Sequence, residues 1–252
     1  EKGICNIFFS HCNLQCVYCQ NCQISRNDTP VRRMELEEIV SVVSRSLDEG
    51  ASSVGFVSPS HMIPQMRALV EALREAGRRP TIVMNTNAYD RAGVIESLAG
   101  IVDVYLPDFK YMDPSLALEL SGAWDYPDVA RAALREMYRQ KGSDLVLRED
   151  GSASSGLIVR HLMLPGHVEN SKAVLRAIAG ELSTSVHLSL MAQYYPPPPV
   201  AGHPYLGRTI TRGEYDEVVD ELERLGFEHG WVQELESESS YRPDFSKPHP
   251  FE

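Results

Sequence analysis

The sequence predicts an α/β fold, a barrel or partial barrel built from six strand-helix units in series. Three observations lead to this prediction. Short apolar runs alternate with stretches of helical period through most of the chain. A crossover helix after each strand returns the chain to the same end of the sheet, so the strands should run parallel. Polar residues gather where the apolar runs end, which is where such barrels carry their chemistry.

Each predicted strand is a short apolar run bounded by turn residues. These runs are residues 3–9, 52–57, 80–85, 101–109, 156–164 and 186–194. The predicted helices repeat apolar residues every three or four positions, and several end at a glycine such as Gly50 or Gly77. They cover residues 34–50, 63–77, 91–100, 126–142, 171–182 and 211–226.

Two segments near the end of the chain have local signals of their own. Thr211 and Glu214 have the spacing of a capping box, so the last helix should begin at this threonine. The proline-rich residues 194–204 can form neither a helix nor a central strand, because proline lacks the backbone N–H. We expect an exposed loop there.

Composition and charge limit the possible functions. With 252 residues, 43% of them hydrophobic, the chain can bury one substantial core, and we expect a single domain over residues 1–252. The formal net charge of −11 repels polyphosphates, which argues against nucleic acid and anionic membrane surfaces as partners. Because no apolar run approaches the ~18 residues of a membrane span, we expect a cytoplasmic protein.

The cysteine loop, residues 10–25, follows the first predicted strand and holds four of the five cysteines: Cys12, Cys16, Cys19 and Cys22. They are too close in sequence to link distant parts of a fold, which favours metal binding over a disulfide framework. Four thiolates could enclose one zinc ion or an iron-sulfur cluster. Zinc sites usually take ligands from two separated pairs, whereas this run is a single compressed segment. Three thiolates on a four-iron cubane would leave one iron open to a substrate or cofactor.

The stretch CNLQCVYC, with Tyr18 at its aromatic position, resembles the C-x3-C-x-aromatic-C signature of the radical SAM superfamily. Residues 7–21, 105–111, 159–167, 189–194 and 232–239 look like the pyruvate formate-lyase activating enzyme-like family within it. The resemblance implies a partial (β/α)6-type TIM barrel of the radical SAM kind. It also implies one domain with a C-terminal extension over about residues 228–252.

The resemblance further implies cofactors and a reaction. Cys12, Cys16 and Cys19 would hold a [4Fe-4S] cluster, and S-adenosylmethionine (SAM) would bind its fourth iron. One electron into the cluster would cleave SAM to methionine and a 5′-deoxyadenosyl radical, which abstracts hydrogen from a substrate C–H bond. The cofactors carry this chemistry, and the protein must orient them and exclude water.

Candidate SAM contacts lie at the predicted strand ends. Arg160 or Lys110 could pair with the SAM carboxylate, the arginine in a bidentate fork. Tyr18 could pack near the adenine, and Gln193 matches a position where related activating enzymes place a SAM-contacting polar residue. The ribose hydroxyls could bond to Asn85, Asn87 and Asp108.

One part of the chain departs from the superfamily pattern. Many members carry a Gly-Gly-Glu-type motif after the second strand, which binds the SAM ammonium, and this chain has VSPSH there. Ser58, Ser60 or backbone carbonyls would have to replace it, while His61 could assist or be a neutral structural histidine. The other candidates have structural alternatives: a surface ion pair for the aspartate and lysine, a clamp on the sheet for the arginine, and turn chemistry for the asparagines.

Two cysteines remain after the three implied ligands. Cys5 lies within the first predicted strand, where a small buried hydrophobe is the expected role. Cys22 lies three residues past the last ligand, where the family pattern often has a tyrosine. Its thiol could return hydrogen to a substrate radical, which would invert a stereocentre, or it could be an inert loop thiol.

Three functions from different classes follow. The first is an enzyme that makes a redox-neutral change, such as epimerisation of a sugar or peptide carbon, in a small-molecule or natural-product substrate. The second is an activating enzyme that installs a glycyl radical on a partner protein. The third is a non-catalytic module in which four cysteines close a metal site. Either enzyme would need an electron donor such as flavodoxin or ferredoxin. The VSPSH segment, His11 in place of a glycine, and Cys22 favour the first.

Overall fold

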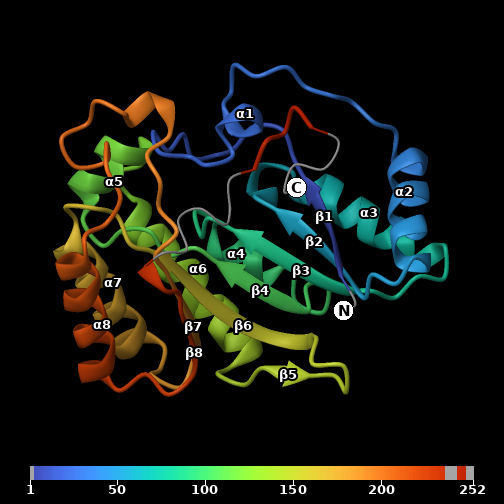
Figure 1. Ribbon diagram of the computed structural model, residues 1–252. Coiled ribbons are helices and arrows are strands. Elements are labelled where there is room, and N and C mark those ends of the chain that lie inside the picture. Colours follow the sequence, from blue (N-terminus) through green and yellow to red (C-terminus); the bar gives the residue numbers. More distant parts are fainter. Residues whose placement is uncertain (1–2, 236–242, 248–252) are drawn as a thin grey trace.

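The computed structural model of the chain describes residues 3–235 and 243–247, and its centre is a curved, mostly parallel sheet (Figure 1). The strands follow the order β1-β2-β3-β4-β6-β7-β8, and every neighbouring pair along this path is parallel. Their bounds are β1 Ile4–Phe8, β2 Ser53–Val57, β3 Thr81–Thr86, β4 Val104–Pro107, β6 Ala153–Leu162, β7 His187–Met191 and β8 Gly230–Val232. Within the described residues β1 and β8 are not paired with each other, so the barrel is partial, as predicted.

The helices cover the outer side of this sheet (Figure 1). The larger ones are α2 Leu36–Asp48, α3 Ile63–Glu75, α5 Pro114–Ser121, α6 Tyr126–Lys141, α7 Val168–Glu181 and α8 Arg212–Leu225. The shorter ones are α1 Cys22–Ser25, α4 Ala92–Glu96 and two 3-10 turns, Pro59–His61 and Pro198–Val200. Leu69, Leu134 and Leu175, from three different helices, are almost fully buried in the core beneath the sheet. In the part of the chain described, no helix has both the length and the apolar character that crossing a bilayer requires.

The predicted elements are confirmed, with local differences. All six predicted strands and all six predicted helices form, and the predicted capping box at Thr211 and Glu214 begins α8. β5 (Val146–Leu147), which pairs antiparallel with β6, and α5 were not predicted. The expected exposed loop at residues 194–204 is wrong in part, because Tyr194 and Val200 are buried there. The Tyr194 hydroxyl donates to the Leu206 carbonyl at 2.7 Å, which folds this segment back onto the core.

Candidate functional site

A cavity of about 290 Å³ lies at the C-terminal ends of the parallel strands. The cysteine loop forms one wall, and the ends of β2, β3, β4, β6 and β7 contribute the others. Most of the residues singled out in the sequence line it: Cys12, Cys16, Tyr18, Cys19, Ser58, Asn85, Asn87, Asp108, Lys110, Arg160 and Gln193. Ser60, His61 and Cys22 do not.

Each of the three thiols that line the cavity has a hydrogen-bond partner. The sulfur of Cys12 accepts from the Leu14 amide and from Asn87 Nδ2, both at 3.4 Å. The sulfur of Cys16 accepts from the Ser121 hydroxyl at 3.0 Å. Cys19 Sγ lies 3.1 Å from Ser25 Oγ.

Burial raises the pKa of Cys16 to about 11, while the nearby Lys110 ammonium acts in the opposite direction. Burial also raises the pKa of the Cys12 thiol. A metal centre bound to these sulfurs would favour their thiolate forms.

Asp108 joins two cations at the cavity wall. Its Oδ1 accepts from Arg160 Nε at 2.8 Å, and its Oδ2 accepts from Lys110 Nζ at 2.9 Å. Arg160 Nη2 also donates to Asn85 Oδ1 at 2.8 Å. Burial alone would raise the pKa of Asp108, but Arg160 and Lys110 hold it below its usual value. Two cations and one carboxylate leave one positive charge in excess.

This cluster is not the surface ion pair that the sequence left open. The side chains of Asp108, Lys110 and Arg160 are only 16–25% exposed. Parallel pairing brings them together, because Asp108, which directly follows β4, forms a bridge with Arg160 near the C-terminal end of β6. In Figure 1, β4 lies between β6 and β3, which supplies Asn85.

The Tyr126 hydroxyl fixes the ends of β3 and β4 from beneath. It accepts from the Lys110 amide at 2.9 Å and lies 2.7 Å from the Asp108 carbonyl and 2.9 Å from the Asn87 carbonyl. Tyr126 is the first residue of α6 and is fully buried. The charged residues of the cavity are therefore held by α6 as well as by their own strands.

Three non-glycine residues near strand ends adopt left-handed backbone conformations: His11 (φ 71°), Ser58 (φ 51°) and Ala88 (φ 62°). Such conformations cost energy for residues with a Cβ and tend to occur at functional sites. Ser58 lines the cavity itself, while His11 and Ala88 directly precede or follow the lining residues Cys12 and Asn87. The strain is thus concentrated around the cavity.

Ser60 and His61 have structural contacts in place of the predicted SAM contacts. Ser60 Oγ lies 3.2 Å from Thr86 Oγ1, and His61 Nε2 lies 2.9 Å from the Ser10 carbonyl. Cys22 begins α1 and is partly buried. None of the three lines the cavity, so Ser58 is the one polar residue of the VSPSH segment among the lining residues, beside Val57.

The match to known families decides what this cavity belongs to. The model of the Radical SAM superfamily matches residues 6–148, which is more than half of the chain. The chain belongs to the Radical SAM superfamily. Members of this superfamily bind a [4Fe-4S] cluster and SAM. The matched residues include the cysteine loop and most of the strand ends that line the cavity.

Two individual proteins are similar to this chain in sequence. The chain is 25% identical over 232 residues to the uncharacterized protein MJ0674 of Methanocaldococcus jannaschii, covering 88% of this chain and 62% of that one. It is 35% identical over 120 residues to 7-carboxy-7-deazaguanine synthase of Methanopyrus kandleri, covering 39% of this chain and 48% of the synthase. The chain thus spans about half to three-fifths of the length of these relatives.

The fold is similar to that of solved radical SAM enzymes. Streptococcus suis SuiB, solved with S-adenosylmethionine, has a TM-score of 0.62 at 14% identity, covering 95% of this chain and 52% of SuiB. SuiB bound to its precursor peptide SuiA matches equally well, covering 92% of this chain and 49% of SuiB.

The residues of the cavity fit the superfamily's cofactors. Three soft sulfur donors, each with a hydrogen-bond partner, line one cavity beside an excess positive charge. Within residues 3–235 and 243–247, no three His, Cys, Asp or Glu side chains converge closely enough to hold a single metal ion. Cysteine sulfurs are the usual ligands of iron-sulfur clusters, and the neighbouring cations suit a cofactor that carries a carboxylate.

Part of the cavity wall comes from the C-terminal part of the chain, which no sequence pattern indicated. Pro243 lines the cavity, and the next two residues are tied to the N-terminal part. The Phe245 ring packs edge-on against Phe8 of β1 with ring centroids 5.1 Å apart. Gln23 of α1 accepts from the Phe245 amide at 2.7 Å and donates to Asp244 at 3.2 Å.

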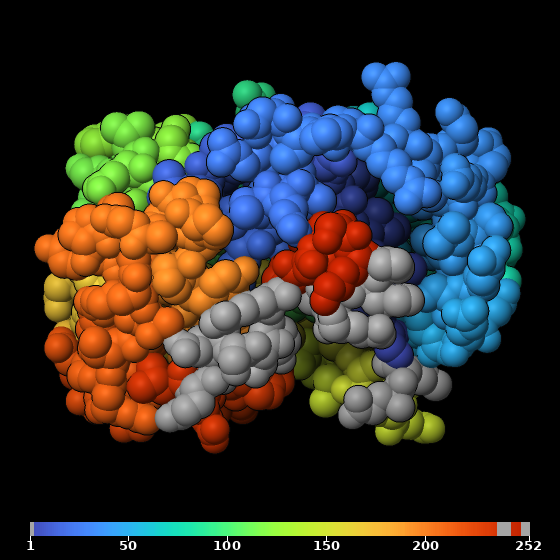
Figure 2. All heavy atoms as spheres, turned by 45° about the horizontal axis from the view of Figure 1, so that its top comes forward, coloured from blue at the N-terminus to red at the C-terminus, as the bar shows by residue number. Residues whose placement is uncertain are grey.

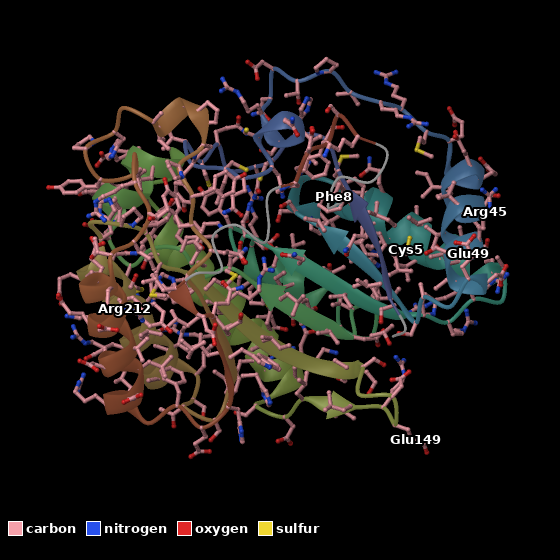
Figure 3. All side chains as sticks on the ribbon, in the orientation of Figure 1. Cys5, Phe8, Arg45, Glu49, Glu149 and Arg212 are labelled. Atoms are coloured by element: carbon pink, nitrogen blue, oxygen red, sulfur yellow. The ribbon has the colours of Figure 1, made fainter. Side chains whose placement is uncertain are left out.

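Figure 2 shows this C-terminal segment, residues 243–247, beside the N-terminal residues on the face of the molecule, and Figure 3 shows Phe8 on β1 with Cys5 further back on the same strand. Cys5 is partly buried and packs against the core, in line with the role expected for it. The remaining parts of the predicted C-terminal extension, residues 236–242 and 248–252, lie outside the described residues.

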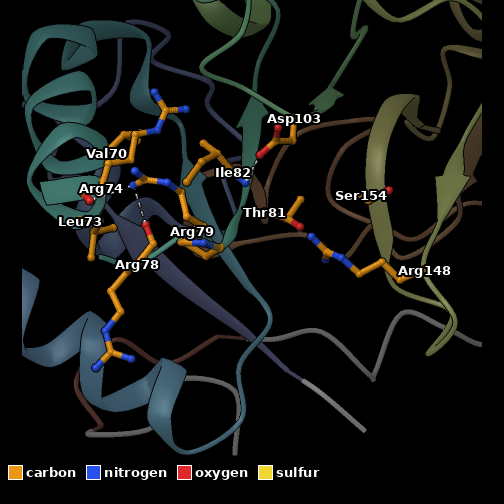
Figure 4. A pocket seen from close by; sticks show the side chains of 11 residues that line it. Val70, Leu73, Arg74, Arg78, Arg79, Thr81, Ile82, Asp103, Arg148 and Ser154 are labelled. Carbon is orange, nitrogen blue, oxygen red and sulfur yellow. Dashed lines mark hydrogen bonds between the residues drawn. The ribbon is translucent and has the colours of Figure 1, made fainter. Parts of the chain in front are cut away.

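A second pocket, of about 240 Å³, lies at the opposite ends of the strands and is lined by several arginines (Figure 4). Most of these arginines are already engaged. Arg78 forms a two-pronged pair with Asp48, Arg74 donates to the Gly100 carbonyl, and Arg79 donates to the Arg74 carbonyl. These contacts connect the end of α3 to its neighbours, which is a structural role.

Proposed function

We propose that this radical SAM protein holds a [4Fe-4S] cluster on Cys12, Cys16 and Cys19 and binds SAM in the same cavity. When bound, these cofactors supply a 5′-deoxyadenosyl radical that abstracts hydrogen from a substrate C–H bond. We further propose a redox-neutral change, such as epimerisation of a sugar or peptide carbon, in a small-molecule or natural-product substrate. A one-electron donor of the flavodoxin or ferredoxin type would serve the cluster.

The excess positive charge at Asp108, Lys110 and Arg160 carries this proposal. One of the two cations can pair with the carboxylate of SAM while the other stays with Asp108. A charge-assisted hydrogen bond in so sheltered a place is stronger than one in water. Lys110 also lowers the pKa of Cys16, so the same ammonium assists formation of the thiolate.

The other predicted contacts keep roles in the proposal. Asn85 and Asn87 lie where a ribose hydroxyl could bond to them, although each already has a protein partner. Gln193 is held by Gln233, whose Nε2 donates to Gln193 Oε1 at 2.9 Å. Tyr18 is almost fully buried and would place its ring, not its hydroxyl, beside the adenine.

The C-terminal segment favours a small substrate over a large one. Pro243 occupies part of the cavity wall, and its neighbours are fixed by the contacts to Gln23 and Phe8. A protein loop that carried a glycine into the cavity would have to displace these contacts. Cys22 does not line the cavity, so the hydrogen that an epimerisation returns to the substrate radical would come from another donor.

Anaerobic reconstitution with iron and sulfide, followed by reduction and addition of SAM, tests the proposal. We expect 5′-deoxyadenosine and methionine from the wild type and from Cys22→Ala, and neither from Cys16→Ala. Cys5→Ala is the matched control, since Cys5 is a partly buried cysteine outside the cavity. An assembled cluster without SAM cleavage in the wild type would contradict the proposal, and loss of the metal in Cys22→Ala would favour the four-cysteine binding module.

The second candidate is a glycyl-radical activating enzyme, and the stretches that look like the activating enzyme-like family favour it. The two candidates differ in where the abstracted hydrogen comes from. We would supply peptides with deuterium on a glycine Cα and, separately, fully deuterated hexoses and nucleosides, and analyse 5′-deoxyadenosine by mass spectrometry. Deuterium transfer from the glycyl peptides alone would support the activating enzyme.

A further inference from the structure

A chain of hydroxyl groups leads from the core of the protein to one of the cavity thiols. Tyr18 Oη lies 2.6 Å from Tyr111 Oη, which lies 2.7 Å from Ser121 Oγ. Ser121 Oγ lies 3.0 Å from the sulfur of Cys16. The four residues come from the cysteine loop, the segment after β4 and the last turn of α5. Neither cofactor needs these hydroxyls as ligands.

The chemistry of the sulfur sets the direction of this chain. A thiolate bound to iron has no hydrogen to donate, so the Ser121 hydroxyl must donate to Cys16. Its oxygen is then free to accept from Tyr111, and Tyr111 in turn accepts from Tyr18. All three O–H groups therefore point toward Cys16. Hydrogen bonds aligned in this way polarise one another, so the last donor is stronger than an isolated serine.

The row of hydroxyl groups from Tyr18 to Ser121 is sheltered from water along its whole length. Tyr111 is fully buried, and Ser121 and Tyr18 are 3% and 5% exposed. Both tyrosine hydroxyls carry a hydrogen at neutral pH, so they can act as donors. Because water does not compete at these positions, the polarisation is transmitted to the sulfur.

The end of α5 places the terminal donor. Asp113 caps the start of this helix by accepting from the Ser115 and Leu116 amides, and Gly122 ends it in a left-handed conformation. Ser121 is the last helical residue, and the Leu120 carbonyl accepts from the Val17 amide at 2.9 Å. The helix end is thus bonded to the cysteine loop by backbone as well as by side chain.

We propose that Ser121, aligned by Tyr111 and Tyr18, is a positioning residue that raises the reduction potential of the cluster through Cys16. This inference rests on the proposed ligation of the cluster by Cys12, Cys16 and Cys19. Reduction of the cluster adds one electron and leaves the protons of the three hydroxyl groups in place. A hydrogen bond to a ligand sulfur stabilises the more negative, reduced cluster more than the oxidised one. The cluster therefore accepts its electron more readily when the three aligned hydroxyl groups are present.

The test is a redox titration of the reconstituted, SAM-free protein, monitored by electron paramagnetic resonance. For Ser121→Ala we expect the equilibrium constant for reduction to fall about five- to tenfold, a shift of about 40 to 60 mV to lower potential for one electron. Tyr111→Phe and Tyr18→Phe should shift the potential in the same direction by less, because the serine can still donate. Tyr138→Phe is the matched control, since its hydroxyl bonds to Ser143 elsewhere in the protein.

The outcomes separate this inference from the proposed function. A wild type that assembles no cluster overturns the ligand assignment. Intact clusters with equal potentials in the wild type and Ser121→Ala overturn the inference and leave the proposed function standing. If Ser121→Ala fails to hold iron, the two tyrosine variants still decide the question, because they leave the serine in place. Ser121→Thr, which keeps the hydroxyl, should restore the wild-type potential.

Discussion

Arg160 is a single residue on which much of the cavity depends. It bonds to Asp108 and to Asn85, so it joins the ends of three adjacent strands as well as contributing one of the two cations. Because a strand alternates its side chains, a shift of β6 by one residue would turn this guanidinium away from the cavity. The position of one side chain thus reports on the register of the sheet.

Replacing this arginine should weaken SAM binding. In Arg160→Met the positive charge of Lys110 is fully matched by Asp108, so no cation remains for the SAM carboxylate. We expect the dissociation constant of SAM to rise roughly 10- to 100-fold, since a hydrogen bond to a charged group contributes about 1.5–3 kcal/mol. Calorimetric titration of the reconstituted protein with SAM measures it. Arg135→Met, which removes an ion pair on α6, should bind SAM normally, and an unchanged constant in Arg160→Met would refute the assignment.

His161 should make stability depend on pH. Its ring is buried between the Phe109 carbonyl and the Ser171 hydroxyl, and burial lowers its pKa to about 4. The folded state therefore resists a proton that the unfolded chain accepts near pH 6.5. The resulting stability is complete above pH 6.5 and is lost as the pH falls toward 4, by about 3 kcal/mol in total.

Melting temperatures of the wild type and His161→Gln between pH 4.5 and 7 check this expectation. Carboxyl groups such as Glu214, whose pKa is lowered to about 2 by its bonds to Arg208, also begin to lose their stabilising effect below about pH 5, but they do so equally in both proteins. We expect the wild type to lose stability more steeply than the variant as the pH falls. Melting temperatures that fall equally with pH in both proteins would show that protonation of His161 does not destabilise the folded state.

At the scale of elements, α6 supports the cavity through its first residue. Tyr126→Phe removes the acceptor of the Lys110 amide and the hydroxyl beside two carbonyls at the ends of β3 and β4. We expect a loss of about 1–3 kcal/mol in the free energy of unfolding, measured with urea, together with weaker SAM binding. Tyr105→Phe is the control, because its hydroxyl bonds to Gln140 on the outer side of the sheet. Normal SAM binding in Tyr126→Phe would show that the strand ends keep their positions without it.

The strand ends were predictable from the sequence because polar residues directly follow apolar runs, and parallel strands bring those ends to one edge. Asp108 and Lys110, which close the run of residues 101–109, were placed in this way, whereas Arg160 lies inside the run of residues 156–164. Ser121 was missed, although Asp113-Pro114 before it and Gly122 after it are ordinary signals for the ends of a short helix. Ser60 and His61 follow Ser58, whose left-handed backbone no local pattern indicated, and neither lines the cavity.

At the scale of the whole molecule, the two ends of the chain meet at the cavity. No pattern within residues 243–247 indicates where they pack, since their contacts are made to residues more than 200 positions away. Such contacts depend on the complete fold and not on local periodicity. Because these contacts join residues that are far apart in sequence, the order of residues 243–247 reports whether this part of the cavity wall is in place.

Gln23 should control how firmly this segment is held. Gln23→Ala removes two hydrogen bonds, one to the Phe245 amide and one to Asp244, which together contribute about 1–2 kcal/mol. We expect backbone hydrogen exchange in residues 243–247 to become about 5- to 30-fold faster, as measured by mass spectrometry. Gln65→Ala, an exposed glutamine of α3, serves as the control. Unaltered exchange in Gln23→Ala would mean that other contacts, such as the packing of Phe245 on Phe8, hold the segment.

Because residues 243–247 complete the cavity wall, the cavity is finished only late in the synthesis of the protein. Gln23 and Asp244 are separated by 221 positions, so at about 5–20 residues per second the ribosome needs roughly 10 to 45 seconds to make the second after the first. Throughout that interval the cysteine loop exists while the Pro243 side of its cavity does not. Delivery of iron and sulfide during translation would meet an open approach that the finished chain partly closes.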